Sequence, residues 1–198
     1  MAAGARVMLL ELNEVPFRVL DEYGRRHPQG ALAALMRASE QYESWAEDRV
    51  LSPWVTWPSL HRGVADDRHG IRHLGQDVGA ADAAHPAVWR LLSAAGLSCG
   101  VFGSLHTHPP PADAERYAFY VPDAFAPSAQ CHPETVTAFQ SFNLAMSRAW
   151  APNVAAGVSW KPALRMLGGA PRLGIRPRTL AAAARQLADE RVRPWRRA

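Results

Sequence analysis

Residues 86–103, PAVWRLLSAAGLSCGVFG, decide the fold class that the sequence predicts. Apolar side chains recur there at the spacing of one helix face, at Val88, Leu91, Leu92 and Ala95. Gly96 is a typical residue for the helix C-cap. After a link of about two residues, the usual length of an αβ connection, residues 97–103 are predicted as a strand. A helix that leads so directly into a strand is typical of an α/β domain.

The same alternation extends to both sides of this stretch. An apolar run at residues 6–12 has no polar alternation, which predicts a central strand buried on both faces. Other strands are predicted at residues 42–45 and 119–121, and helices from Pro16 and over residues 31–39, 133–147 and 177–192. The predicted fold is therefore α/β, with a mostly parallel sheet and helices on both faces.

Chain length and the cysteines limit the class of protein. The 198 residues suffice for one α/β domain with a hydrophobic core. No apolar run approaches the length that spans a bilayer, and Glu11 interrupts the N-terminal run too early for a secretory signal. We therefore expect a cytoplasmic protein with no membrane partner. Cys99 and Cys131 lie far apart in the sequence, and we expect buried apolar side chains rather than ligands or a disulfide.

The net charge of +4 conceals an asymmetry. Residues 151–198 carry ten basic and two acidic side chains, whereas residues 1–150 carry twelve basic and sixteen acidic ones. The pattern of elements also loosens beyond Trp150. We therefore divide the chain into residues 1–150, the α/β part, and residues 151–198, a basic helical extension that would begin a lid or insertion. The extension has no recognised nucleic-acid motif, and we expect a solvated or partner-covered face rather than nucleic-acid binding.

Residues 52–71, SPWVTWPSLHRGVADDRHGI, contain the best candidate for chemistry, Thr56. Pro58 is typical of the first turn of a helix, which predicts that Thr56 lies at or next to a helix N-terminus. Unpaired N–H groups and the positive end of the helix dipole would there stabilise an alkoxide or bind a tetrahedral anion. An ordinary helix cap is the alternative. Ser59 lies past Pro58 within the helical turn and is a weaker candidate for a nucleophile.

Histidines and acids elsewhere have simpler interpretations. His69 is expected to fix its turn by hydrogen bonding, with Asp66 and Asp67 as solvated turn residues. His106 and His108 form an HxH pair that suits zinc, but two histidines alone do not close a metal site, and three prolines follow. The isolated histidines are expected to have no metal role: His61, His73 and His85.

The order of these motifs resembles the N-terminal half of the alkaline phosphatase superfamily. The resemblance lies in a strand, polar residues Asn13 and Glu14, a T-aromatic-P-small motif at Thr56 and an HGI turn. The nearest branch is the type I phosphodiesterase and nucleotide pyrophosphatase group. Two further segments, YVPDAFA at 120–126 and AFQSFNLAMSR at 138–148, are similar to those of uncharacterised bacterial members. The resemblance covers about residues 6–150.

This resemblance implies an alkaline phosphatase-like fold and a hydrolase of phosphoric or sulfuric esters with Thr56 as the nucleophile. It further implies that Asn13, Glu14 and Thr56 hold one divalent metal, zinc or manganese. The family usually has Asp where Asn13 stands, and a neutral amide holds a dication less tightly unless Glu14 or Glu11 compensates. The alternative is that Asn13 and Glu14 simply cap the helix that follows.

The resemblance also implies a second metal, bound by Asp and His residues of the family's C-terminal half. After His132 the chain has no histidine, and after Glu134 its only acids are Asp189 and Glu190. We therefore expect that the chain does not encode the second site and is the N-terminal part of a longer enzyme or a truncated relative. Its expected partners are a small phosphate or sulfate ester and a missing C-terminal half. The alternative is a non-catalytic binding or scaffold module that keeps the fold but lacks a complete metal site.

Overall fold

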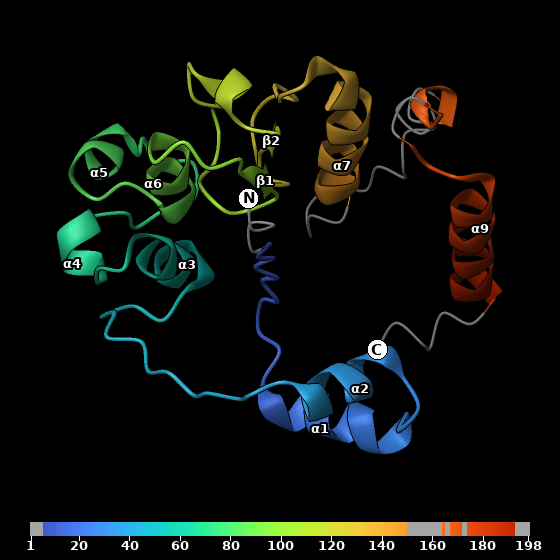
Figure 1. Ribbon diagram of the computed structural model, residues 1–198. Coiled ribbons are helices and arrows are strands. Elements are labelled where there is room, and N and C mark those ends of the chain that lie inside the picture. Colours follow the sequence, from blue (N-terminus) through green and yellow to red (C-terminus); the bar gives the residue numbers. More distant parts are fainter. Residues whose placement is uncertain (1–5, 150–163, 165–166, 172–173, 193–198) are drawn as a thin grey trace, which may run out of the picture.

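The computed structural model in Figure 1 describes residues 6–149, 164, 167–171 and 174–192. Its helices are α1 (Phe17–Arg26), α2 (Ala31–Ala38), α3 (Pro53–Arg62), α4 (Asp66–His69), α5 (Gly79–Ala84), α6 (Val88–Ala94), α7 (Thr137–Ala149) and α9 (Pro177–Val192). The strands are β1 (Gly100–Phe102) and β2 (Phe119–Val121), and short 3-10 turns cover Ala114–Arg116 and Glu134–Val136.

The stretch that predicted the fold class forms the elements expected of it. Helix α6 ends in a Schellman motif, in which Leu97 N–H donates to the Leu92 carbonyl at 3.0 Å and Gly96 N–H donates to Ser93 O at 3.0 Å. Gly96 has a φ of +75°, a left-handed conformation that glycine adopts without a steric penalty. The motif reverses the chain, and β1 follows directly.

The sheet is parallel and lies between helices. β1 and β2 pair with Val101 opposite Tyr120. Val101 is buried with Tyr120 and with Trp89 of α6, whereas Phe102 turns to the opposite face, 5.5 Å from the Phe139 ring of α7 by centroid distance. Figure 1 accordingly shows α6 on one side of the strands and α7 on the other. The mixed α/β class with a parallel sheet is confirmed, although the sheet of the described residues has two strands.

The predicted central strand at residues 6–12 is wrong. This segment has no regular secondary structure, and side chains such as Val7 and Met8 are almost fully exposed. A strand buried on both faces needs partners along its edges and helices above and below it. Residues 42–45 are not a strand either, and Tyr42 and Trp45 are exposed. In both segments the sequence is apolar, which favours burial, but no described element covers these side chains.

The C-terminal part confirms one prediction and leaves another outside the described residues. Helix α9 covers the predicted range, Pro177–Val192. The boundary placed between residues 150 and 151 lies outside the described residues, as does the start of the predicted extension. Among the described residues, no helix is both long and apolar enough to cross a membrane.

Helix α7 is attached to the loop after β2 through Gln140, which is completely buried. The Gln140 Nε2 group donates to the carbonyl oxygens of Pro122 at 3.1 Å and Asp123 at 3.2 Å. Its Oε1 atom accepts a hydrogen bond from Asn143 Nδ2 at 3.3 Å. Gln140 belongs to the FQSFNL segment and Pro122 to the VPDAFA segment, so the structure brings together two motifs that are separate in the sequence.

We predict that Gln140→Leu lowers the free energy of unfolding by about 1–3 kcal/mol, because two buried carbonyl groups lose their donor. Urea unfolding followed by far-UV circular dichroism measures the change. The matched control is Gln29→Leu at an exposed position, for which we expect a change within about 0.5 kcal/mol. Equal effects of the two substitutions would contradict the role given to Gln140.

Candidate active site on helix α3

Helix α3 begins earlier than the sequence analysis predicted, and this changes the position of Thr56. Ser52 is the N-cap and Pro53 the first helical residue, so Thr56 is the fourth residue and Pro58 lies inside the helix. The N–H groups of Val55 and Thr56 both donate to the Ser52 carbonyl at 2.8 Å. Since Pro53 has no N–H, the first turn offers fewer free donors to an anion than predicted. A Ser followed by Pro is the start signal that the prediction overlooked.

Pro58 leaves one helical carbonyl without its usual partner, and His106 fills the gap. A residue at position 58 would normally donate its N–H to the carbonyl of Trp54, and proline cannot. Instead, His106 Nε2 lies 2.9 Å from Trp54 O and donates to it. The bond fixes the ring proton on Nε2 and attaches the loop after β1 to the first turn of α3. Burial lowers the pKa of His106, which favours its neutral form.

The predicted metal ligands approach α3 but do not form a group. Asn13 Oδ1 accepts a hydrogen bond from Trp57 Nε1 at 3.0 Å, so Asn13 lies against the residue that follows Thr56. The Thr56 hydroxyl donates to Ser52 O at 3.1 Å. Glu14 is exposed, has a φ of +55° and forms no hydrogen bond to the described side chains. The segment that contains Asn13 and Glu14 thus contacts α3, but through a hydrogen bond between Asn13 and Trp57 and not through Thr56.

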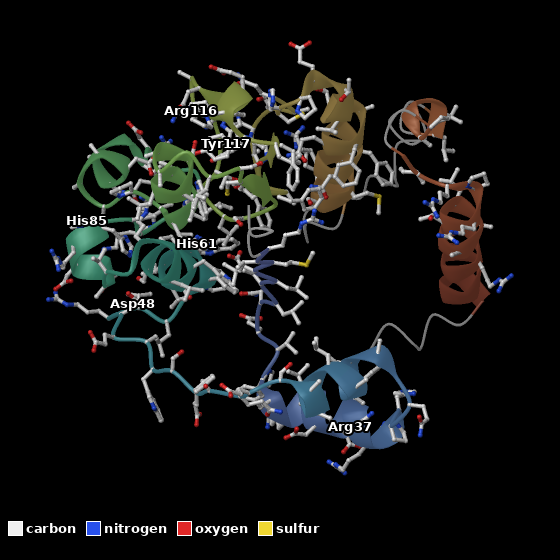
Figure 2. The ribbon with its side chains drawn as sticks, viewed as in Figure 1. Arg37, Asp48, His61, His85, Arg116 and Tyr117 are labelled. Carbon is white, nitrogen blue, oxygen red and sulfur yellow. The ribbon has the colours of Figure 1, made fainter. Side chains whose placement is uncertain are left out.

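Glu11, a residue the sequence analysis treated only as a possible substitute ligand, forms the main polar contact at this site. Its Oε1 atom accepts a hydrogen bond from Nε2 of the buried His61 at 2.7 Å, and its Oε2 atom accepts one from Ser104 Oγ at 3.3 Å. His61, labelled in Figure 2, lies between Trp57 and Trp89, with ring centroids 5.9 Å and 4.8 Å away. The N-terminal segment, α3 and the end of β1 therefore meet at Glu11.

The Glu11 carboxyl is ionised at neutral pH. Burial alone would raise its pKa, but the hydrogen bonds from His61 and Ser104 and the charge of His61 outweigh that effect, and the pKa falls below its usual value. His61 itself is a buried core histidine with one carboxylate partner.

A part-buried set of hydrogen bonds joins Ser59, His69 and Asp48. It contains the three residue types of a catalytic triad, but the hydrogen bonds run in the opposite direction. Ile71 N–H donates to His69 Nδ1 at 3.0 Å, which places the ring proton on Nε2. His69 Nε2 then donates to Ser59 Oγ at 2.9 Å, and the Ser59 hydroxyl donates to Asp48 Oδ1 at 2.5 Å. A nucleophilic serine would instead give its proton to the histidine. These hydrogen bonds therefore have a structural role, and His69 fixes its turn as expected.

The expectation for Asp66 is also wrong. It was predicted to be a solvated turn residue, but its side chain is buried and pairs with Arg72. Asp66 N–H donates to Asp48 Oδ1 at 2.9 Å, and Arg49 N–H donates to Asp66 Oδ1 at 3.2 Å. These reciprocal bonds join the segment before α3, on which Figure 2 labels Asp48, to the start of α4. Asp67 is exposed, as predicted.

The two histidines of the HxH pair have separate partners within the protein. His106 Nε2 bonds to Trp54 O, and His108 Nε2 lies 2.9 Å from Ser128 Oγ. Burial lowers the pKa of both histidines, against the opposing charge of Asp123. Across the described parts of the chain, no three His, Cys, Asp or Glu side chains are grouped closely enough to hold a metal. Cys131 is buried, as expected, whereas Cys99 is only half-buried, and both are free thiols.

The candidate site is formed where three segments of the chain come together at α3. Residues 11–13, the first turn of α3 and residues 104–106 meet beyond the carboxyl end of β1, where parallel sheets usually bind ligands. Glu11 and His106, the residues that hold this site together, were missed as partners of α3. Only the internal Pro58 could have pointed to a need for His106.

Comparisons with protein-family models, curated proteins and solved structures find no match for this chain. The similarity to the alkaline phosphatase superfamily therefore stays a prediction that rests on the order of motifs.

Three histidines with lowered pKa values predict how stability depends on pH. Burial lowers the pKa values of His69, His106 and His108, so the unfolded chain takes up protons at a higher pH than the folded one. The free energy of unfolding should therefore fall as the pH drops through 6.5, the ordinary value of histidine. Urea unfolding at pH 7.5 and at pH 5.5, two values about one unit on either side, measures the loss.

His106→Gln keeps a side-chain donor for Trp54 O but removes the titration. We expect this variant to lose less stability than the wild type between the two pH values, whereas His106→Leu costs about 1 kcal/mol at both. His73→Gln, at an exposed position, is the matched control. An unchanged pH dependence in His106→Gln would show that this histidine does not contribute.

Proposed function

We propose that the chain carries part of a hydrolase of phosphoric or sulfuric esters, with Thr56 as its nucleophile. In this reaction Thr56 Oγ forms a bond to phosphorus or sulfur, the ester oxygen leaves with the proton that the hydroxyl gives up, and water later cleaves the covalent intermediate. The observation that supports the proposal is the convergence of residues 11–13, the first turn of α3 and residues 104–106 around the helix that carries Thr56.

The described residues do not by themselves fit a metal centre. Asn13 Oδ1 is bonded to Trp57, the Thr56 hydroxyl to Ser52 O, and no group of three ligands forms among the described side chains. We therefore assign no step of the reaction to a metal. If zinc or manganese takes part, Asn13, Glu14 and Thr56 would supply one side of the site, and a further polypeptide would have to supply the remaining ligands.

A second candidate is a non-catalytic binding or scaffold module with the same fold. The observation that favours it is that Thr56, Asn13 and Glu11 are already bonded within the protein. Such a module would need no attacking hydroxyl, and its ligand would not be a tetrahedral anion. The two candidates therefore differ in whether the first turn of α3 binds phosphate.

We predict that inorganic phosphate binds at the first turn of α3. A titration followed by ¹H–¹⁵N NMR should shift the amide signals of residues 54–57 and 104–106, and Thr56→Val should weaken binding, because it replaces the hydroxyl with a methyl group of similar size. Thr135→Val, at an exposed position, is the control and should bind phosphate like the wild type. If no signal in these two segments moves, the site does not bind phosphate, and the scaffold reading is favoured.

We also predict that the 198-residue chain alone hydrolyses p-nitrophenyl phosphate, its bis-ester and its sulfate at or near the background rate, even with added zinc or manganese. The reason is that the described residues lack a complete set of ligands to stabilise the leaving oxygen. Product absorbance measures the rate. Substantial turnover that a chelator removes would contradict the proposal that the site is incomplete.

A further inference from the structure

One edge of the sheet has unpaired backbone groups. On the side of β2, the carbonyl of Cys99 accepts a hydrogen bond and the N–H of Gly103 donates one, both at 2.9 Å. Alternate residues of a strand point their backbone groups to opposite sides, so those of Gly100 and Phe102 point away from β2. Within the described part of the chain, their only partner on that side is the Cys99 thiol, 4.0 Å from the Gly100 oxygen. Such an edge is a template for a further strand.

The apolar run at residues 7–10 also lacks partners. Val7 is 92% exposed, Met8 88%, Leu9 66% and Leu10 70%. Among the described residues, no backbone hydrogen bond involves these four. A water-soluble surface rarely displays such a group of neighbouring apolar side chains, because their burial is favourable. The run therefore has a backbone and side chains whose needs a place in a sheet would meet.

The end of the run is already attached next to the end of β1. Glu11 accepts a hydrogen bond from Ser104, which closely follows the last residue of β1, Phe102. The other carboxylate oxygen of Glu11 accepts a hydrogen bond from His61 of α3. Figure 1 shows the run between the pair of helices α1 and α2 and the part of the chain that contains the sheet. The run is therefore held at one end of the free edge and is not a free tail.

We propose that residues 7–10 close onto the free edge of β1 as a third, parallel strand, and that the described conformation is the open state of this segment. Glu11 and Ser104 are 93 positions apart and already in contact. The same offset along two parallel strands places Met8 level with Val101. An antiparallel strand that starts from the same contact would instead run beyond the end of β1 and leave its edge unpaired.

This register pairs the free backbone groups of both segments. In a parallel ladder, a residue bonds to the two neighbours of the residue that is level with it. Met8 N–H therefore donates to Gly100 O, and Phe102 N–H donates to Met8 O. Leu10 N–H donates to Phe102 O in the same way. The other two N–H groups of the run point to the new outer edge of the sheet.

The closed state also covers side chains on both faces of the sheet. Side chains of residues that are level with each other in neighbouring strands lie on the same face. Met8 therefore joins the face of Val101, which is buried against α6, and Leu9 joins the face of Phe102 beside α7. Phe102 is 60% exposed in the open state, so it gains cover from Leu9. A strand covered on both faces requires the continuous apolar sequence that this run has.

Hydrogen exchange of the full 198-residue chain, followed for each amide by ¹H–¹⁵N NMR, tests the proposal. The amides of Met8 and Leu10 should be protected, whereas those of Val7 and Leu9 should exchange as fast as in an unfolded chain. The protection should not depend on protein concentration, because the pairing lies within one chain. Protection that rises with concentration, protection of Val7 and Leu9 instead, or protection of none of the four amides would overturn the proposal.

Two proline variants provide a matched pair. Met8→Pro removes the N–H that donates to Gly100 O, whereas Leu9→Pro removes an N–H on the outer edge, where proline is tolerated. Both replace one apolar side chain of the run. We expect the protection factor of the Leu10 amide to be about tenfold lower in Met8→Pro than in Leu9→Pro. Equal protection of Leu10 in the two variants would overturn the proposal.

Discussion

A proline inside α3 is the constraint on which the arrangement around this helix depends. Pro58 cannot donate to the Trp54 carbonyl, and a helical carbonyl without a donor must find one elsewhere. His106 supplies it from the loop after β1, which brings the carboxyl end of the sheet to the first turn of the helix. Helix α3 also carries His61 and Ser59, whose hydrogen bonds to Glu11 and Asp48 attach the two segments that precede the helix.

The same set of contacts limits what the hydroxyl groups of α3 can do. Thr56 and Ser59 both donate their protons within the chain, Thr56 to a carbonyl and Ser59 to a carboxylate. The Ser59 hydroxyl also accepts a hydrogen bond from His69. It therefore both donates and accepts a hydrogen bond within the protein, which gives it a structural role. Thr56 donates through one bond of 3.1 Å, which a rotation of its side chain could exchange for a ligand. Of the two hydroxyl groups, Thr56 is therefore the one that we keep as the proposed nucleophile.

Local features of the sequence predicted the parts of the fold whose determinants lie close together. Helix α6, its Gly96 cap and β1 follow from one short stretch, and α9 follows from its apolar spacing. The error at residues 6–12 has a different origin: an apolar run shows that a segment needs burial, but burial depends on strands and helices from elsewhere. The pairs Glu11–His61 and His106–Trp54 join residues about fifty positions apart. No local sequence pattern predicts such partners. The sequence thus predicted the helix that carries Thr56, and not the hydrogen bonds that attach other segments to it.

The bond between His106 and the Trp54 carbonyl has a consequence for how related sequences would vary. The acceptor is a main-chain atom, so the bond places no demand on the side chain at position 54. Positions 58 and 106 are instead coupled, because any residue other than proline at position 58 can donate its own N–H to the same carbonyl. A histidine or another donor at position 106 is needed only while proline occupies position 58. Covariation between these two positions would therefore record a hydrogen bond in which only one of them takes part.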